Sequence, residues 1–154
     1  MRALLQRVKT ASVSVDGEVI GKADNGYLIL LGVKEGDTER EAEFLAKKTA
    51  ELRVFEDADG KMNLSLLDID GEALVVSQFT LYADCKKGRR PAFVHAEKPP
   101  VANELYEKYV AFLKENGVKS VQTGSFGAHM LISLENDGPV TIMLDTDEIM
   151  TTKK

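Results

Sequence analysis

A chain of 154 residues is long enough for one domain to bury about two thirds of its unfolded surface without a disulfide or a metal. Its 44% hydrophobic and 29% charged residues are ordinary for a water-soluble protein, and the net charge of −5 argues against coating nucleic acid by bulk electrostatics. No long apolar span appears, and the single cysteine is consistent with a reducing compartment. We therefore expect one cytoplasmic domain over residues 1–154, with residues 147–154 as a polar tail and no membrane contact.

The first part of the chain predicts antiparallel strands joined by tight turns. The Asp16-Gly17 and Asn25-Gly26 pairs are typical of turns, because glycine adopts positive φ without steric cost. Residues 27–33 form an almost uninterrupted apolar run, as in a strand buried on both faces. The strands expected here are residues 2–8, 11–15, 18–22 and 27–33.

An amphipathic helix is predicted next. Thr38 and Glu41 have the spacing of a capping box, and apolar residues then recur at helical spacing. A short strand near residues 53–55 should follow. The acidic segments 56–60 and 68–71 lack the ligand spacing of a calcium-binding loop, so we expect them to be turns.

Residues 74–83 are expected to form a central strand, because they are rich in β-branched and aromatic side chains. Alternation would place Gln78 and Thr80 on one face and Ser77 and Phe79 on the other, unless a bulge brings Ser77 and Thr80 together. Buried polar side chains need partners. This polar cluster is therefore either a hydrogen-bonded structural feature or the floor of a site.

A basic loop follows this strand, and its cationic side chains are Lys86, Lys87, Arg89 and Arg90. Such a loop can bind phosphates, although a solvated loop is the simpler interpretation. Prolines then keep the chain irregular until a second amphipathic helix, which should begin near Val101 and end at Gly117.

The remaining residues predict strands. Those expected are residues 118–123, 128–134 and 140–144, with Asn136-Asp137-Gly138-Pro139 as a turn and residues 145–154 as a frayed end. Two helices cannot cover both faces of so many strands. The expected fold class is therefore mixed α/β, with layered or barrel-like β-sheets and two helices packed on one side (β/β/α layers).

Familiar catalytic sets do not occur in the sequence. Ser77 is not in a Gly-x-Ser-x-Gly elbow, and His95 and His129 are the only histidines that could act as its base. His129 should lie opposite the apolar face of its strand, as a surface or interface histidine. Metal-ligand spacings and nucleotide-binding glycine loops are also missing, so we expect no metal and no cofactor. An enzyme built from these residues would use little side-chain acid or base.

Two stretches carry a resemblance to a known family. Ser77-Gln78-Phe79-Thr80 and Asn136-Asp137-Gly138-Pro139-Val140-Thr141 match the signatures Ser-Gln-Phe-Thr and Asn-x-Gly-Pro-Val-Thr. The sequence thereby resembles the D-aminoacyl-tRNA deacylases, which recycle tRNA charged with the wrong-handed amino acid. Further matches cover nearly the whole chain, at residues 5–8, 60–64, 90–93 and 122–126.

The resemblance implies an enzyme that hydrolyses the ester of D-aminoacyl-tRNA, and also of mischarged glycyl-tRNA, with residues 77–80 as the catalytic segment. It implies a homodimer in which Gly138-Pro139, with a cis peptide bond, enters the partner's active site. This Gly-Pro tip would hold the substrate's α-amino group through main-chain oxygens and collide with an L side chain. Arg7 matches the residue that braces the tip. The basic loop would then contact the acceptor end of the tRNA.

Hydrolysis of an activated ester needs an oriented water and a stabilised oxyanion, for which backbone N–H groups near residues 78–80 are suited. The attack could come from Thr80 or from a water assisted by the 2′-hydroxyl of the terminal adenosine of the tRNA. We favour the second, because no residue adjacent in sequence would activate Thr80. The alternative function is a non-catalytic β-rich domain that binds nucleic acid or a protein, with residues 77–80 as a structural cluster.

Overall fold

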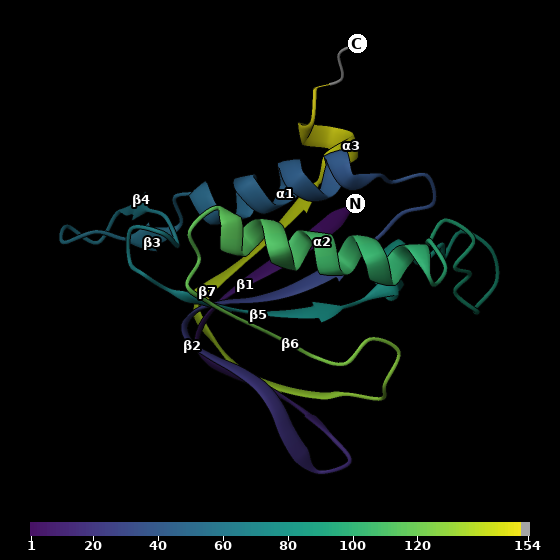
Figure 1. The fold of residues 1–154 in the computed structure, drawn as a ribbon, viewed down its shortest axis with the longest axis horizontal. Helices are drawn as coiled ribbons and strands as arrows, with labels where there is room; N and C mark the ends of the chain where they lie inside the picture. Colours follow the sequence, from purple (N-terminus) through teal and green to yellow (C-terminus); the bar gives the residue numbers. More distant parts are fainter. Residues whose placement is uncertain (152–154) are drawn as a thin grey trace.

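The molecule is built on a five-stranded sheet with helices packed against one face (Figure 1). A computed structural model describes residues 1–151. The strands are β1 (Arg2–Val15), β2 (Glu18–Gly32), β3 (Phe55–Glu56), β4 (Met62–Leu64), β5 (Glu72–Ser77), β6 (Ser120–Thr123) and β7 (Leu131–Asp145). The helices are α1 (Glu39–Glu51), the 3₁₀ helix η1 (Phe79–Tyr82), α2 (Val101–Glu115) and α3 (Thr146–Ile149).

The strands follow the order β6-β5-β2-β1-β7, and β3 and β4 form a separate ribbon. β1 pairs antiparallel with β2 and β7, whereas β5 runs parallel to β2 and β6. α1 and α2 lie side by side across one face of the sheet (Figure 1). The predicted mixed α/β class is therefore confirmed, and within residues 1–151 the edge strands β6 and β7 do not pair to close a barrel.

The long strands β1 and β2 bend halfway along, so the sheet carries an apolar core on each face. Leu5 belongs to the core under the helices and Val13 to the opposite core, although strict alternation would place them on one face. The bend lies at Asn25, where φ is +34°, and a Cβ on Gly26 would lie 1.9 Å from the Glu72 carbonyl oxygen of β5. Asn25-Gly26 is therefore a bend inside a continuous strand, and the predicted turn is wrong.

The sequence patterns that predicted the starts of α1 and α2 are confirmed. The Thr38 side chain accepts a hydrogen bond from the Arg40 backbone N–H (3.3 Å), and the Glu41 carboxylate accepts one from the Thr38 backbone N–H (2.7 Å). These bonds satisfy N–H groups that the first helical turn leaves unpaired. α2 begins at Val101, where the sequence places it.

The C-terminal end of β7 is held in the fold. Asp145 and Thr146 are buried, and the Asp145 side chain accepts a hydrogen bond from the Asp147 backbone N–H (3.0 Å) at the start of α3. The predicted fraying is therefore wrong at these residues, while residues 152–154 lie outside the described part. None of the helices in residues 1–151 is both long and apolar enough to cross a membrane.

Candidate active site

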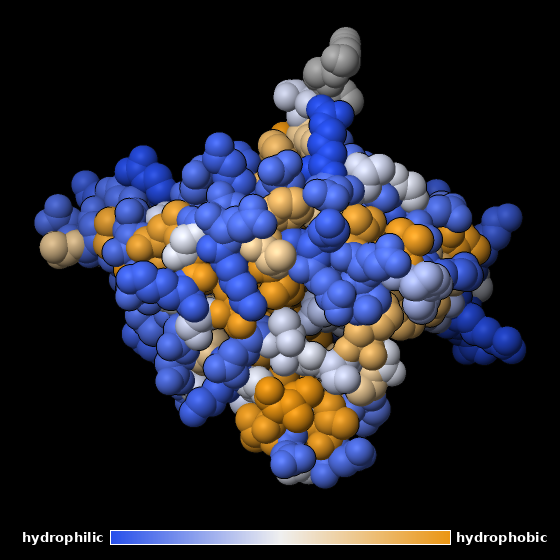
Figure 2. Space-filling view, in the orientation of Figure 1, coloured by the Kyte–Doolittle hydropathy of each residue, from blue (hydrophilic) through white to orange (hydrophobic). Residues whose placement is uncertain are grey.

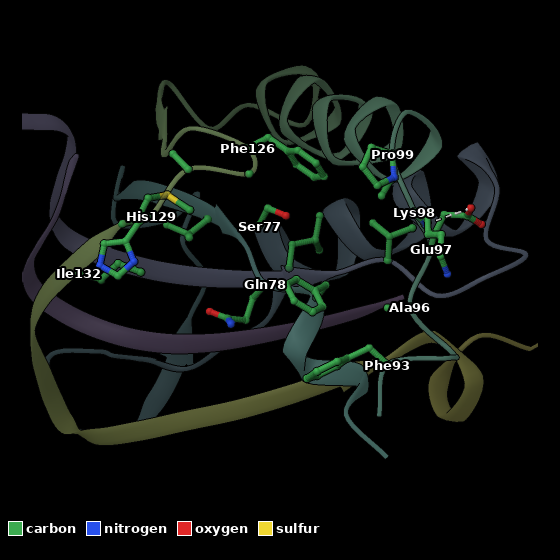
Figure 3. Close-up of a pocket in the computed structure, with 18 residues that line it drawn as sticks. Ser77, Gln78, Phe93, Ala96, Glu97, Lys98, Pro99, Phe126, His129 and Ile132 are labelled. Atoms are coloured by element: carbon green, nitrogen blue, oxygen red, sulfur yellow. Dashed lines mark hydrogen bonds between the residues drawn. The ribbon is translucent and has the colours of Figure 1, made fainter. Parts of the chain in front are cut away.

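A cavity of about 550 Å³ opens where β5 ends, beside the first turn of α2 and the loop before β7 (Figure 3). Ser77 and Gln78 line it from the end of β5, and Phe126 and Pro99 lie on its other side. Most of the lining side chains are apolar, as in sites that bind small organic groups. The segments that contribute most of the lining are residues 76–79, 96–99 and 126–130.

The floor of this cavity is a turn. β5 ends at Ser77, the backbone N–H of Gln78 donates to the Leu31 carbonyl oxygen (2.8 Å), and η1 follows at once. The prediction of one strand over residues 74–83 is therefore wrong beyond Ser77. In the turn, the Gln78 side-chain Nε2 donates to the Thr80 hydroxyl, so these two polar groups form a pair at the edge of the cavity.

The start of η1 offers two backbone donors to a ligand. The first backbone bond of η1 runs from Leu81 N–H to the Gln78 carbonyl oxygen (3.2 Å), so the N–H groups of Phe79 and Thr80 precede it. No hydrogen bond among residues 1–151 uses either of these two N–H groups. Phe79 lines the cavity and is 54% exposed. Two such donors can stabilise a carbonyl oxygen that gains negative charge.

The Gly-Pro tip lies on β7, opposite β1. Gln6 pairs with Thr141 on one side of the tip and Val8 pairs with Asn136 on the other, so the residues between them bulge out of a strand that stays paired. The predicted turn at this position is therefore wrong. The Gly138-Pro139 peptide bond is cis, and both residues are exposed.

Arg7 fixes the base of this bulge. Its side chain is only 6% exposed, and its Nη1 donates to the Val54 carbonyl oxygen (2.7 Å). Its Nε donates to the Asp137 carbonyl oxygen (3.3 Å) and lies 3.4 Å from the Asp137 carboxylate. Arg7 therefore links the residue before the tip to the segment after α1.

The two signature segments lie apart in this chain. Residues 77–79 line the cavity, whereas the Gly-Pro tip and Arg7 are absent from the lining within the part of the chain that the structure describes. The cavity of a single chain therefore contains only the first of the two signature segments.

The basic loop stands next to the cavity. An antiparallel bridge closes it, because Asp84 N–H donates to the Ala92 carbonyl oxygen (2.7 Å) and Ala92 N–H donates to that of Asp84 (2.9 Å). Phe93, directly after the bridge, lines the cavity and packs edge-on against Phe79 with ring centroids 4.9 Å apart. The cationic side chains of the loop are exposed, and none of the ion pairs among residues 1–151 involves them: Lys86, Lys87, Arg89 and Arg90.

The walls of the cavity come from two irregular segments, residues 96–99 before α2 and residues 126–130 before β7. The strand predicted over residues 128–134 is wrong at its start, because β7 begins only at Leu131. Residues 126–130 are mostly apolar, whereas residues 96–99 include Glu97 and Lys98. Such segments give no catalytic signal. His129, expected as a surface or interface histidine, is exposed and lies on the cavity rim (Figure 3).

Comparison with known proteins agrees with this geometry. The family model described as D-Tyr-tRNA(Tyr) deacylase matches residues 4–145. A D-aminoacyl-tRNA deacylase of Thermus aquaticus is 59% identical over 96% of this chain and 97% of its own length. A D-aminoacyl-tRNA deacylase of Thermosipho africanus is 54% identical over 97% of this chain and 99% of its own length. The solved structure of c-Myc DNA Unwinding Element Binding Protein is 41% identical, with a TM-score of 0.89 over 94% of this chain and 98% of that one.

The family model and these relatives define the class as a hydrolase, of the D-aminoacyl-tRNA deacylase type. The resemblance seen in the two signatures is thereby confirmed. The chain belongs to the D-Tyr-tRNA(Tyr) deacylase family.

Proposed function

We propose that the protein hydrolyses the ester bond of D-aminoacyl-tRNA and of mischarged glycyl-tRNA, releasing amino acid and tRNA, and rejects L-aminoacyl-tRNA. The observation that carries this proposal is the pair of N–H groups of Phe79 and Thr80, which no acceptor in residues 1–151 engages, beside an apolar cavity. An aminoacyl ester is already activated, so an oriented water and a stabilised oxyanion suffice for its hydrolysis. Apolar walls strengthen such hydrogen bonds because they exclude bulk water.

The Gly-Pro tip serves the cavity of a partner chain in a homodimer. In support, the tip is exposed on β7, an edge strand of the sheet, and does not line the cavity of its own chain. Main-chain oxygens at the tip accept hydrogen bonds from the α-amino group of the substrate. An L side chain then collides with the backbone of the tip, whereas a D side chain turns away and glycine has none to collide.

Apolar surface supports association of two chains. Figure 2 shows an apolar area at the hairpin end of β1 and β2, where Val19 and Ile20 are 59% and 42% exposed. Leu131 on the edge strand β7 is 68% exposed and pairs with Ser14, the residue of β1 that pairs with Val19 on its other side. Exposed apolar groups that gather in this way mark protein contact surfaces.

Thr80 acts through its backbone and does not attack the ester. Its hydroxyl accepts a hydrogen bond from the Gln78 amide, and an amide N–H cannot remove the hydroxyl proton. A threonine nucleophile needs a base to remove that proton. The attack therefore comes from a water that the 2′-hydroxyl of the terminal adenosine assists.

The basic loop holds the acceptor end of the tRNA. In support, its cationic side chains are exposed beside the cavity. Exposed Lys and Arg bind phosphates and release counterions, so this contribution to tRNA affinity weakens as salt concentration rises.

The first test is the turnover of D-tyrosyl-, L-tyrosyl- and glycyl-tRNA by the purified protein. Hydrolysis of the D and glycyl esters alone supports the whole proposal. Hydrolysis of the L ester would overturn the selector, and no turnover at all would favour a domain that only binds.

An experiment that mixes two variants tests whether the Gly-Pro tip of one chain completes the cavity of its partner. A Gly138→Ala variant carries an intact cavity with an altered tip, and an Ala128→Phe variant carries an intact tip with a filled cavity. Random pairing of the two impaired variants restores about a quarter of the wild-type sites, because half of the dimers then hold one intact cavity and one intact tip that meet. If the tip served its own chain, mixing would restore nothing.

A further inference from the structure

The phenol of Tyr106 joins α2 to the strand that leads into the candidate active site. Tyr106 lies on the buried face of α2, and its hydroxyl donates to the Val75 carbonyl oxygen (2.7 Å). Val75 is on β5, two residues before Ser77, where the floor of the cavity begins. A shift of this carbonyl therefore moves the floor.

The same carbonyl also holds one wall of the cavity. The Gly124 backbone N–H donates to the Val75 oxygen (3.2 Å), and Gly124 opens the loop whose residues 126–130 line the cavity. The ring of Tyr106 packs against that of Phe126, with centroids 6.1 Å apart. The Val75 carbonyl oxygen thus accepts hydrogen bonds from α2 and from the loop of the wall, and it belongs to the strand that leads to the floor.

Packing alone does not fix this wall. A hollow of about 270 Å³, open to solvent, lies on its far side between α2 and the loop, and Tyr106, Gly124 and Phe126 all line it. The wall therefore has few protein contacts on that side to hold it against the floor. The Tyr106 hydroxyl bond and the Gly124 N–H bond, which share the Val75 oxygen, are the polar contacts that hold α2 and the wall to the strand of the floor.

We propose that Tyr106 is a positioning residue for ester hydrolysis, whose hydroxyl sets the separation between the cavity floor at residues 77–79 and the wall at residues 126–130. The proposal rests on the site assigned above. Tyr106 contacts no substrate in this role. It acts through the Val75 carbonyl, and so on the geometry in which the ester meets the N–H groups of Phe79 and Thr80.

The hydroxyl keeps its proton throughout the working pH range. Burial raises the pKa of Tyr106 to about 12, although the neighbouring polar groups of Thr123 and Gly124 partly oppose the shift. The phenol therefore remains a donor to Val75, and the proposed role does not change with pH near neutrality.

The helix supplies a matched control. Tyr109 is also buried on α2, and its hydroxyl bonds to Thr49 Oγ1 (2.8 Å) on α1, away from the cavity. Tyr106→Phe and Tyr109→Phe each delete one buried hydroxyl and its hydrogen bond from the same helix. Both should therefore lower the unfolding midpoint in urea by similar amounts.

The test compares kcat and KM for D-tyrosyl-tRNA in the two variants, well below their unfolding midpoints. Tyr106→Phe is expected to lower kcat/KM about tenfold, with part of the loss in KM, because misplacement by a fraction of an ångström disturbs orientation. Tyr109→Phe should stay within about twofold of wild type on the same reasoning. KM does not depend on the amount of folded enzyme, so a raised KM cannot come from lost stability.

Equal kinetics in the two variants, or a wild-type KM and kcat in Tyr106→Phe, would overturn the proposal. If Tyr106→Phe is too unstable to assay, 4-fluorophenylalanine at position 106 keeps the ring and fills the place of the hydroxyl but cannot donate to Val75, and unchanged kinetics there would also refute it. Absence of turnover in the wild-type protein would instead refute the proposed function, so the two failures are distinguishable.

Discussion

Gly138→Ala is the most informative single change at the Gly-Pro tip, because two costs fall on the same residue. Gly138 has φ +118°, a region that L side chains rarely adopt, and holding Ala there costs about 1–3 kcal/mol. The new Cβ would also lie 2.8 Å from Arg7 Nη2 and 3.0 Å from Val140 Cγ2. Relief of this contact requires Arg7 to move from the Val54 and Asp137 carbonyl oxygens, and each such charged hydrogen bond contributes about 1.5–3 kcal/mol.

The expected loss of activity follows from the backbone cost alone, taken near the middle of its range of about 1–3 kcal/mol. If about 2 kcal/mol separates the productive tip from a relaxed one in the variant, the productive form falls roughly thirtyfold in population, since each 1.4 kcal/mol is a factor of ten. We therefore expect kcat/KM for D-tyrosyl-tRNA to fall at least about tenfold. Steady-state deacylation kinetics, with urea unfolding on the same preparations, measure both quantities.

Gly60→Ala is the matched control. Gly60 also has a left-handed φ of +77°, but nothing lies within 4 Å of a Cβ there, and it stands in the β3–β4 turn. It should lose stability from the backbone cost alone and keep full activity. If Gly138→Ala also kept full activity while it lost stability, the tip would have no part in the site and the selector would have to be abandoned.

The remaining predictions concern charge. Replacing Lys86 and Lys87 by Ala should lower the slope of log Kd for tRNA against log salt concentration by about 1–2, measured by filter binding, because two phosphate contacts are lost. Lys119→Ala, at an exposed lysine far along the chain, should leave that slope unchanged, and an equal effect there would argue against a specific loop contact. Hydrogen bonding from the Asn63 side chain holds the pKa of the Asp57 carboxyl below its usual value. Ionised Asp57 therefore stabilises the fold at any pH above the usual carboxyl pKa, and this stabilisation is lost as the pH falls through the lowered pKa of the folded state. Asp57→Asn should therefore lower the thermal midpoint at neutral pH but not in acid, and a difference that persisted in acid would contradict the assignment.

Features that depend on neighbouring residues were predictable from the sequence. The Thr38 capping box and the Asp16-Gly17 hairpin turn are both present, since their hydrogen bonds and backbone angles are set within a few residues. Asn25-Gly26 has the same composition as a turn, yet it is a bend, because β1 pairs with β2 both before and after it and β5 pairs with β2 from Gly26 onward. The pairing of distant strands decided between two structures that the local residues allow equally.

In the candidate site, too, the sequence predicted what neighbouring residues determine and missed what distant strands determine. The signature at residues 77–80 identified the floor. The predicted strand ran too far, because the apolar pattern on which it was based continues into η1, where Tyr82 is buried. Gly138-Pro139 was identified as special, while its bulge depends on pairing with β1, where the contact from Arg7 to Asp137 spans 130 residues of sequence. The walls come from irregular segments without a motif, which cannot be told from other loops until the fold places them together.

The bridge between Asp84 and Ala92 separates the basic loop from the cavity floor. It closes the basic loop at its base, so that insertions or charge changes between these two residues need not displace the cavity floor or η1. Under the proposed function, changes in the loop would alter tRNA affinity without changing the backbone geometry at the end of β5. For an engineer, the same bridge marks a segment where loops from relatives could be exchanged without rebuilding the candidate site at the end of β5.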